Sequence, residues 1–382
     1  MKIALVTSSF LPQVGGAEYA VHYLANAWSR QGHEVWVINS NTEVPTHPEA
    51  LYKTLKYTFL RGTTRYGFHK FPFCQYAVRG IKKCLDKVRP EYISGYFVYP
   101  TGYYLSLIKP RVGYDIAALG SDITKNPWSY RIRYNCQRHI QKALEGANRC
   151  IAISDHAVEL YKELIGDARK IVKIPYGVDI GRFSKKVEVD IRGKLNIDKD
   201  SFLVLSVGRN HEAKDYKTGI RAFSLLLKQC PNAVYLLVGR DVRKLQAVAD
   251  EYGVSDQVVL QEGLAEDEVA AAYQQSDVFL SCSRQEMFPL VTIEAMACGR
   301  PIVVTNISGN QDLVVQGKNG FIAEPGDYQE MSECLLRIAK DSELRSRMGI
   351  ENRRISQDYD WDTISRKYRI SAENGGMINA AS

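Results

Sequence analysis

Short apolar runs alternate with longer amphipathic segments along most of this chain. The runs at 2–8 and 34–39 flank a segment whose apolar residues, at 20, 23, 24, 27 and 28, recur with helical spacing. A buried strand, a helix and a second buried strand predict a right-handed β-α-β unit. The same alternation returns through 92–165 and again through 201–306. The pattern therefore predicts an α/β fold built from parallel sheets covered by helices.

The length and composition of the chain limit the alternatives. Its 382 residues favour two domains, and a charged, turn-rich piece at 185–200 separates two series of predicted elements. Hydrophobic content of 45% and charged content of 24% are ordinary for a globular protein. No apolar run approaches the roughly 18 residues that would cross a bilayer, and the first strand is too short for a signal peptide. Eight cysteines without a Cys-x-x-Cys pair favour a reducing, cytoplasmic setting.

The net charge of +7 is unevenly distributed. Residues 51–90 contain ten lysines and arginines, one acid, and eight interleaved aromatic residues. Three interpretations stay open: a solvated face, a surface that meets an anionic membrane, or a nucleic-acid surface. We favour the first two and expect no nucleic-acid partner.

One stretch, 284–299, combines a loop with a helix. It follows an apolar run at 277–283 that is typical of a buried strand. Pro289 suits the first turn of a helix, where its missing N–H group is not needed. Gly299 suits the helix end, and Pro301 prevents its continuation. We therefore expect a strand, a loop and a helix in that order.

The polar groups of this stretch suggest a particular ligand. The N–H groups of Leu290, Val291 and Thr292 are expected to point from the helix start toward the loop, which is a natural anion site. Glu286 lies in the loop and Glu294 lies further along the helix. Carboxylates accept hydrogen bonds from hydroxyls. A ligand that carries both phosphate and hydroxyl groups, such as a nucleotide sugar, would satisfy both features.

Two other loops contain residues that would suit a ligand with phosphate groups. The doublet Gly15-Gly16 follows the first strand and would let the backbone approach a phosphate, although taken alone such a doublet is more often a simple tight turn. Arg209 and Lys214 lie in a loop between a strand and a helix. Two cations placed there would stabilise the charge of a departing nucleoside diphosphate without a metal. A surface salt bridge is the simpler alternative for both.

The spacing Glu286-x7-Glu294, set between Asp277-Val-Phe-Leu-Ser and Glu294-Ala-Met-Ala-Cys-Gly, resembles a known motif. It is similar to the Glu-x7-Glu motif of retaining glycosyltransferases with the GT-B fold, especially glycosyltransferase family 4. This resemblance implies two Rossmann-like domains that face each other across a cleft. The expected boundaries are 1–184 for the first domain, 185–200 for a linker and 201–359 for the second. Residues 360–382 would form a helix that crosses back to the first domain, with a frayed end.

The resemblance also implies roles for the residues described above. Glu286 would contact hydroxyls of the donor sugar, and Glu294 the ribose. Arg209 and Lys214 would contact the diphosphate. Gly15 and Gly16 would lie beside the diphosphate and the acceptor.

Further positions depart from the family pattern. Leu119 stands where relatives often have His or Arg before the polar pair Ser121 and Asp122, which would face the sugar or acceptor. A helix N-cap is an equal alternative for Asp122. Arg240, with Leu264 and Ala265, would line the base pocket.

The family's glycine-rich loop is altered in this chain. Met287, Phe288 and Pro289 occupy it. Met287 adds bulk, and Pro289 removes one N–H group. Phe288, Leu290 and Val291 can still offer theirs.

The implied activity is transfer of a sugar, with retention, from a UDP- or GDP-sugar to a hydroxyl of a glycan or lipid-linked acceptor. Such transfer serves polysaccharide or lipopolysaccharide biosynthesis. No metal and no cofactor are expected, and Asp358-Tyr-Asp360 is interpreted as a chance match to a metal motif. The 51–90 segment would hold the protein at the inner face of a membrane. Two alternatives remain: a nucleotide-sugar epimerase of the same fold, and a non-catalytic nucleotide-sugar-binding protein.

Overall fold

The computed structural model describes residues 1–12, 15–58, 74–120, 122–125, 129–133 and 135–368, and for Tyr130 and Arg133 the backbone alone. The chain divides into two compact units. Unit 1 comprises Met1–Gly177 and Trp361–Ser382, and unit 2 comprises Val178–Asp360. The two units are described separately below.

Unit 1 is built on a parallel sheet with the strand order β3-β2-β1-β4-β5-β6-β7. In the centre, Ala4 pairs with Trp36 on one side and with Ile93 on the other. Only the first residue of β1 is exposed, as expected for a strand covered on both faces. The strands are β1 (Lys2–Thr7), β2 (Glu34–Asn39), β3 (Lys53–Lys56), β4 (Tyr92–Tyr96), β5 (Asp115–Ala117), β6 (Arg149–Ala152) and β7 (Ile171–Lys173).

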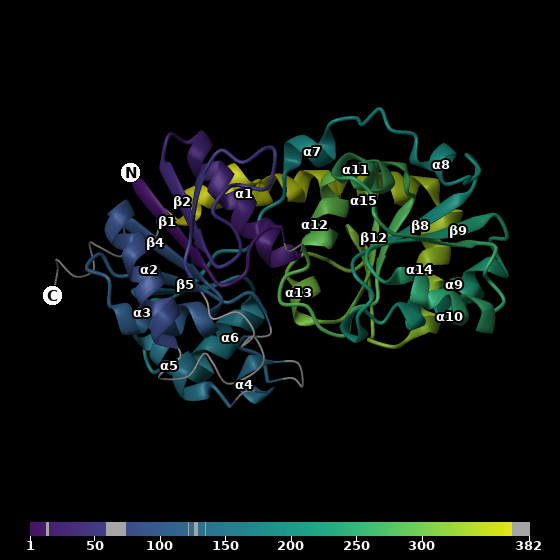
Figure 1. Ribbon diagram of the computed structural model, residues 1–382. Coiled ribbons are helices and arrows are strands. Elements are labelled where there is room, and N and C mark those ends of the chain that lie inside the picture. The colour runs from purple at the N-terminus through teal and green to yellow at the C-terminus, as the bar shows by residue number, and fades with distance from the viewer. Residues whose placement is uncertain (13–14, 59–73, 121, 126–128, 134, 369–382) are drawn as a thin grey trace. The chain divides into compact units, whose positions relative to one another are not determined.

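Right-handed crossovers decide which face of this sheet each helix covers. The connection through α1 runs outward from β1 to β2, whereas the connection through α2 returns across the sheet to β4. The helices α2, α3 and α5 therefore cover the face opposite α1, and Figure 1 shows them beside one another. The helices are α1 (Gly16–Arg30), α2 (Cys74–Val88), α3 (Tyr103–Ile108), α4 (Tyr130–Arg133), α5 (Gln137–Glu145) and α6 (Asp155–Leu164), with the short turns η1 (Val98–Gly102) and η2 (Ala168–Lys170).

The helical residues 361–368 belong to unit 1 and pack beside α1. The indole Nε1 of Trp28 donates to the carbonyl of Ser365 at 3.2 Å. Arg149 pairs with Asp115 in the interior and also donates to the carbonyl of Tyr368 at 3.3 Å. These bonds hold the end of the described chain on the unit that begins it.

Unit 2 contains a second parallel sheet, with the order β10-β9-β8-β11-β12-β13. Val204 of β8 pairs with Tyr235 on one side and with Val278 on the other. The strands are β8 (Phe202–Val207), β9 (Ala233–Val238), β10 (Val258–Gln261), β11 (Val278–Ser281), β12 (Ile302–Thr305) and β13 (Gly320–Ala323).

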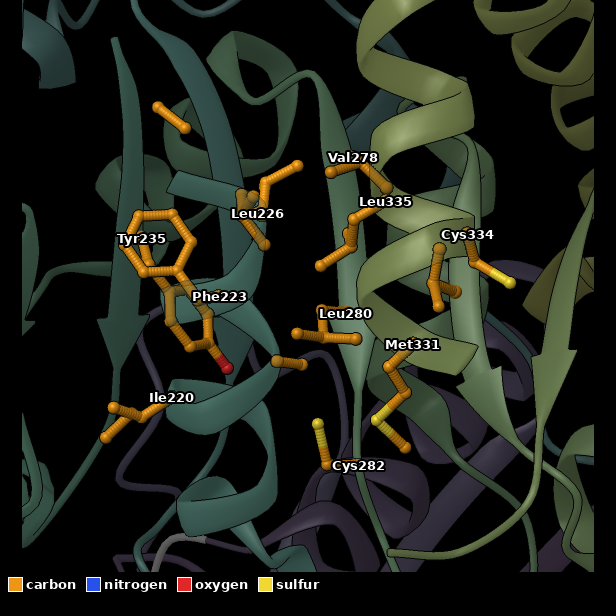
Figure 2. Packing of buried hydrophobic residues seen from close by; sticks show 14 of the residues in the cluster. Ile220, Phe223, Leu226, Tyr235, Val278, Leu280, Cys282, Met331, Cys334 and Leu335 are labelled. Carbon is orange, nitrogen blue, oxygen red and sulfur yellow. The ribbon is translucent and has the colours of Figure 1, made fainter. Parts of the chain in front are cut away.

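The helices of unit 2 cover both faces of its sheet. In Figure 2, α9 and α14 cover one face, with Phe223, Leu226 and Leu335 packed near Leu280 of β11. The return crossover from β10 to β11 places α11 and α12 on the other face, where α15 also packs against α12. The helices are α7 (Ile180–Ser184), α8 (Ile191–Lys194), α9 (Tyr216–Leu227), α10 (Gln246–Glu251), α11 (Glu266–Gln275), α12 (Leu290–Ala297), α13 (Ser308–Gln311), α14 (Tyr328–Lys340) and α15 (Ser342–Ser356), with the turns η3 (Glu212–Lys214), η4 (Val242–Leu245) and η5 (Gln357–Tyr359).

The segment expected to be a linker, 185–200, is folded onto unit 2. Ile191 is fully buried, and its N–H group donates to the side chain of Gln275 at 3.1 Å. The amide of Gln275 also donates to the carbonyl of Val189 at 2.6 Å. The boundary between the two units thus falls after Gly177. Backbone groups of α7 and of the segment that follows it form hydrogen bonds with side chains of α11, such as the bond from Gln274 to the carbonyl of Phe183.

No helix in the described parts of the chain is long and apolar enough to cross a membrane.

Candidate active site

The candidate residues of unit 2 lie where the strand order of its sheet reverses, between β8 and β11. From β8 the chain continues toward β9, and from β11 it continues toward β12 on the other side. The loops after β8 and β11 therefore leave the carboxyl ends of neighbouring strands in opposite directions. Ligands of open α/β sheets bind at such a switch point. Arg209 and Lys214 follow β8, and Glu286 follows β11.

Two glycines shape the backbone at this edge. Gly208 has φ +145° and Gly239 has φ +150°, conformations that other residues rarely adopt. A Cβ atom on Gly239 would lie 2.0 Å from the carbonyl oxygen of Gly208. Glycine is therefore required where the ends of β8 and β9 approach each other.

Lys214 and Glu286 meet directly across the two loops. The ammonium of Lys214 forms a short ion pair with one carboxylate oxygen of Glu286. The hydroxyl of Ser283 donates to the same oxygen at 3.0 Å. Both charged side chains keep about a fifth of their surface exposed, 21% and 17%. The pair is thus built into the loops and still open to a ligand.

Arg209 behaves differently from Lys214. Its side chain is exposed, and within the described residues it makes no ion pair. The structure therefore leaves one of the two expected phosphate-binding cations engaged with a carboxylate and the other one unengaged.

Arg284 fastens the two loops to each other, a role that its sequence position did not reveal. Its guanidinium donates to Asp215 at 2.7 Å. Its backbone N–H group donates to the carbonyl of Ala213 at 2.8 Å. These contacts fix the positions of Lys214 and Glu286 relative to each other.

Glu294 lies on α12 and faces α11. It accepts a hydrogen bond from the hydroxyl of Tyr273 at 2.8 Å. Although part of the residue is accessible, burial of the carboxyl raises the pKa of Glu294 to about 7, and Tyr273, Arg182 and Lys214 oppose the shift. Arg182 itself forms a short ion pair with Glu266. Tyr273 and Arg182 are partners that the sequence pattern did not indicate.

The start of α12 differs in one respect from the expectation. Pro289 precedes the first helical residue, Leu290, and the carbonyl of Pro289 accepts the N–H group of Thr292 at 3.0 Å. The expectation that Thr292 offers its N–H group to a ligand is therefore wrong, because the turn itself uses it. Leu290 and Val291 lie in the first turn of α12, so their N–H groups have no partner inside the helix.

The altered loop before α12 is packed into unit 2. Met287 and Phe288 are each 6% exposed, and the ring of Phe288 lies 6.0 Å from that of Tyr359, centroid to centroid. A Cβ atom on Gly309 would lie 2.9 Å from the carbonyl oxygen of Glu286. Helix α13 thus packs against the loop, and the side chain of Met287 is buried.

Arg240 lies at the end of β9. Its side chain is exposed and lies 3.6 Å from the carboxylate of Asp241. Its carbonyl accepts the N–H group of Asn210 at 2.8 Å. The expected base-pocket residues Leu264 and Ala265 directly precede α11.

The candidate residues Gly15 and Gly16 belong to unit 1. Gly15 caps α1 in an extended conformation, and Gly16 begins the helix. A Cβ atom on Gly15 would lie 2.5 Å from a carboxylate oxygen of Glu18. Glu18 is 6% exposed and accepts a hydrogen bond from Ser9. The carboxylate of Glu18, to which the sequence pattern gave no role, thus lies directly beside position 15.

Asp122 is almost fully buried and accepts three backbone N–H groups. The donors are Val98 at 2.7 Å, Leu119 at 3.1 Å and Gly120 at 3.0 Å. Burial raises the pKa of Asp122 to about 6, while these hydrogen bonds lower it. The carboxylate therefore joins the ends of β4 and β5. Its neighbour Ser121 lies outside the described residues.

Among the described residues, one group could offer three ligand atoms to a metal: His22, His47 and Glu49, with those atoms within 4.8 Å of one another. The ring nitrogens of His22 already contact the hydroxyl of Tyr52 at 2.7 Å and the amide of Asn26 at 3.3 Å. The group belongs to unit 1, whereas Lys214 belongs to unit 2.

Two family models match this chain over almost its whole length. Residues 14–182 match the model described as Glycosyltransferase Family 4. Residues 188–355 match the model described as Glycosyl transferases group 1. The chain belongs to the family 4-like glycosyltransferases of GT-B fold.

Curated relatives of this glycosyltransferase include a D-inositol 3-phosphate glycosyltransferase from Xylanimonas cellulosilytica. The two are 30% identical over 238 residues, which are 57% of this chain and 56% of the relative. The chain thus spans little more than half the length of that relative. An N-acetyl-alpha-D-glucosaminyl L-malate synthase from Bacillus anthracis is 23% identical over 354 residues, 88% of each chain.

Solved structures share the fold of this glycosyltransferase. A sucrose-phosphate synthase from Thermosynechococcus elongatus has a TM-score of 0.81 and 22% identity, with both chains fully covered. Anabaena Alr3699/HepE in complex with UDP-glucose has a TM-score of 0.78 and 20% identity, with 98% of this chain and 100% of that chain covered. At these identities the likeness establishes the GT-B fold alone. The bound UDP-glucose is a ligand of Alr3699/HepE.

Proposed function

We propose that this glycosyltransferase transfers a sugar from a UDP- or GDP-sugar to a hydroxyl of a glycan or lipid-linked acceptor, with retention and without a metal. One observation carries the proposal. Lys214, Glu286 and Glu294 come from three elements of unit 2 and collect at the switch point between β8 and β11. A cation beside carboxylates matches a ligand in which phosphate and hydroxyl groups adjoin.

Each group of the proposed donor site has a chemical task. The ammonium of Lys214 and the exposed guanidinium of Arg209 would take up the charge of the diphosphate as it leaves. The N–H groups of Leu290 and Val291, at the positive end of α12, would add to this field. Glu286 would accept hydrogen bonds from sugar hydroxyls, and Glu294 from the ribose.

The reaction needs no other reactant than donor and acceptor. The bond from the anomeric carbon to the phosphate oxygen breaks, and the bond to the acceptor oxygen forms on the same face of the sugar. The acceptor's proton passes to the leaving phosphate. This route fits the contacts of Glu286, whose carboxylate is engaged by Lys214 and Ser283 and is therefore poorly suited to act as a nucleophile.

We further propose that helix α2 contacts an anionic membrane. Its buried side is apolar, whereas its exposed side carries Arg79, Lys82, Lys83 and Lys87. Tyr76 lies on the same helix and is 56% exposed. Basic side chains beside an aromatic ring favour the surface of an anionic bilayer. Residues 59–73 of the basic segment lie outside the described residues.

The test is a panel of UDP- and GDP-sugars incubated with the protein, with and without glycan acceptors, followed by NMR of the anomeric protons. The proposal predicts a new glycoside with the anomeric configuration of the donor, at an unchanged rate after treatment with a chelator. An inverted product, or loss of transfer on chelation, would contradict the mechanism. Epimerised nucleotide sugar without transfer would favour the epimerase, and binding without turnover would favour a non-catalytic protein.

A further inference from the structure

Tyr216 begins α9 and is 4% exposed, with its ring inside the core of unit 2. Its hydroxyl has no hydrogen-bond partner among the described residues. A buried polar group without a partner costs about 1–3 kcal/mol, so such groups require an explanation.

The position of the Tyr216 hydroxyl explains why it has no partner. A Cβ atom on Gly208 would lie 2.9 Å from the Tyr216 hydroxyl oxygen and 3.9 Å from the Nζ atom of Lys214. The hydroxyl and the ammonium therefore border the same side of Gly208, where glycine leaves room that any other residue would fill. This side lies at the carboxyl end of β8, inside the proposed donor site.

The hydroxyl is also suited to donate. Burial raises the pKa of Tyr216 well above its ordinary value, and the neighbouring carboxylate of Glu286 raises it further. The hydroxyl of Tyr216 therefore stays protonated at neutral pH. An O–H group beside an ammonium offers two donors to one anion.

Two other buried tyrosines of unit 2 show the contrast. The hydroxyl of Tyr235 lies 2.8 Å from the hydroxyl of Ser206, and that of Tyr273 donates to Glu294 at 2.8 Å. Other buried polar atoms of the described chain also lack partners. Tyr216 differs from them in that its hydroxyl faces a glycine next to a cation of the proposed site.

We propose that Tyr216 is a further donor-binding residue, whose hydroxyl donates a hydrogen bond to a phosphate oxygen placed over Gly208 beside Lys214. This inference rests on the proposed function, because it assigns the ligand of the same site. It adds a neutral donor to the charged groups that hold the diphosphate. The hydroxyl gains its partner when the ligand binds.

The test compares Tyr216→Phe with Tyr235→Phe, each of which removes one buried hydroxyl and keeps the ring. Titration calorimetry with UDP and GDP should show at least about tenfold weaker binding for Tyr216→Phe, because hydrogen bonds to charged groups are the strong ones. Urea denaturation should show that Tyr216→Phe is as stable as the wild type or more stable. Tyr235→Phe should lose stability and keep its affinity. Wild-type affinity in Tyr216→Phe, or a loss of stability as large as that in Tyr235→Phe, would overturn the inference.

Inorganic pyrophosphate separates this inference from the proposed function. If the wild type binds pyrophosphate more tightly than Tyr216→Phe does, yet binds neither UDP nor GDP, the role of Tyr216 stands and the nucleotide-sugar function falls. If nucleotide-sugar transfer proceeds and the variant matches the wild type in all titrations, only the role of Tyr216 falls. If the wild type binds none of the three probes, both are overturned.

Discussion

Replacing Glu294 with Gln should make the protein more stable above pH 7 and a poorer binder of nucleotide. Burial raises the pKa of this carboxyl from its ordinary value of 4.5 to about 7. Folding therefore favours the protonated form, and the stability that this form provides is lost as the pH rises through 7. The glutamine amide stays neutral and keeps an acceptor for the hydroxyl of Tyr273.

The pKa gives the size of the effect. A pKa that rises from 4.5 to about 7 corresponds to at most about 3.5 kcal/mol, at roughly 1.4 kcal/mol per pKa unit. Because part of the residue is accessible, we expect a smaller gain, on the order of 1–2 kcal/mol at pH 8, and almost none at pH 4.5. Over the same range, the affinity of the wild type for UDP or GDP should rise with pH as the carboxylate ionises.

Urea denaturation and calorimetric titration at pH 5, 6, 7 and 8 measure both quantities. Glu351→Gln is the matched control, because Arg354 and Lys318 lower the pKa of Glu351 to about 2. Its carboxylate therefore stabilises the fold above about pH 4.5, so this variant should lose stability at pH 7 and keep its nucleotide affinity. A Glu294→Gln variant whose stability relative to wild type is the same at pH 5 and pH 8, or that binds nucleotide like the wild type, would refute the reasoning.

Other changes test the remaining contacts. Tyr273→Phe removes the hydroxyl that lowers the pKa of Glu294, so the midpoint of the nucleotide-affinity profile should move above that of the wild type; an unmoved midpoint would exclude this coupling. Glu286→Gln releases Lys214, so UDP or GDP should bind several-fold more tightly in calorimetry while sugar transfer falls; weaker nucleotide binding would contradict this. Charge reversal of Lys82 and Lys83 should reduce sedimentation with anionic vesicles at low salt, whereas equal sedimentation of variant and wild type would count against membrane contact by α2.

The order of strands and helices could be predicted from the sequence because parallel strands covered on both faces are continuous apolar runs. The alternation between 201 and 306 predicted β8 through β12 and placed the candidate loops after β8 and β11. The segment 185–200 was harder to interpret. Its charged composition is typical of a linker, but the side chain of Gln275, 75 or more residues further along, satisfies its backbone groups.

The part of the candidate site that could be predicted is the part that depends on residue type and local spacing. Lys214 and Glu286 follow adjacent strands, and the structure brings them into an ion pair. Tyr273, Arg182 and Arg284 could not be found in this way. Their contacts depend on how α7, α11 and the two loops pack, and a buried tyrosine or a surface arginine has no distinctive sequence signal.

The unpaired hydroxyl of Tyr216 and the three N–H donors to Asp122 also could not be predicted from the sequence. The sequence shows only that Asp122 follows a predicted strand. Only the backbone conformation shows that its carboxylate is occupied. Its contact with substrate remains a prediction, as do the roles of Gly15 and Gly16.

The most direct test of the donor site is the release of UDP or GDP from a panel of nucleotide sugars, measured with the wild type and with Lys214→Ala in the presence of glycan acceptors. Loss of one preplaced cation typically costs about 3–4 kcal/mol, or a hundredfold or more in rate. We predict that the wild type releases nucleoside diphosphate from at least one donor and that Lys214→Ala, correctly folded by circular dichroism, does so at least about a hundredfold more slowly. Equal rates for the two proteins, or no release by the wild type from any donor, would contradict the account.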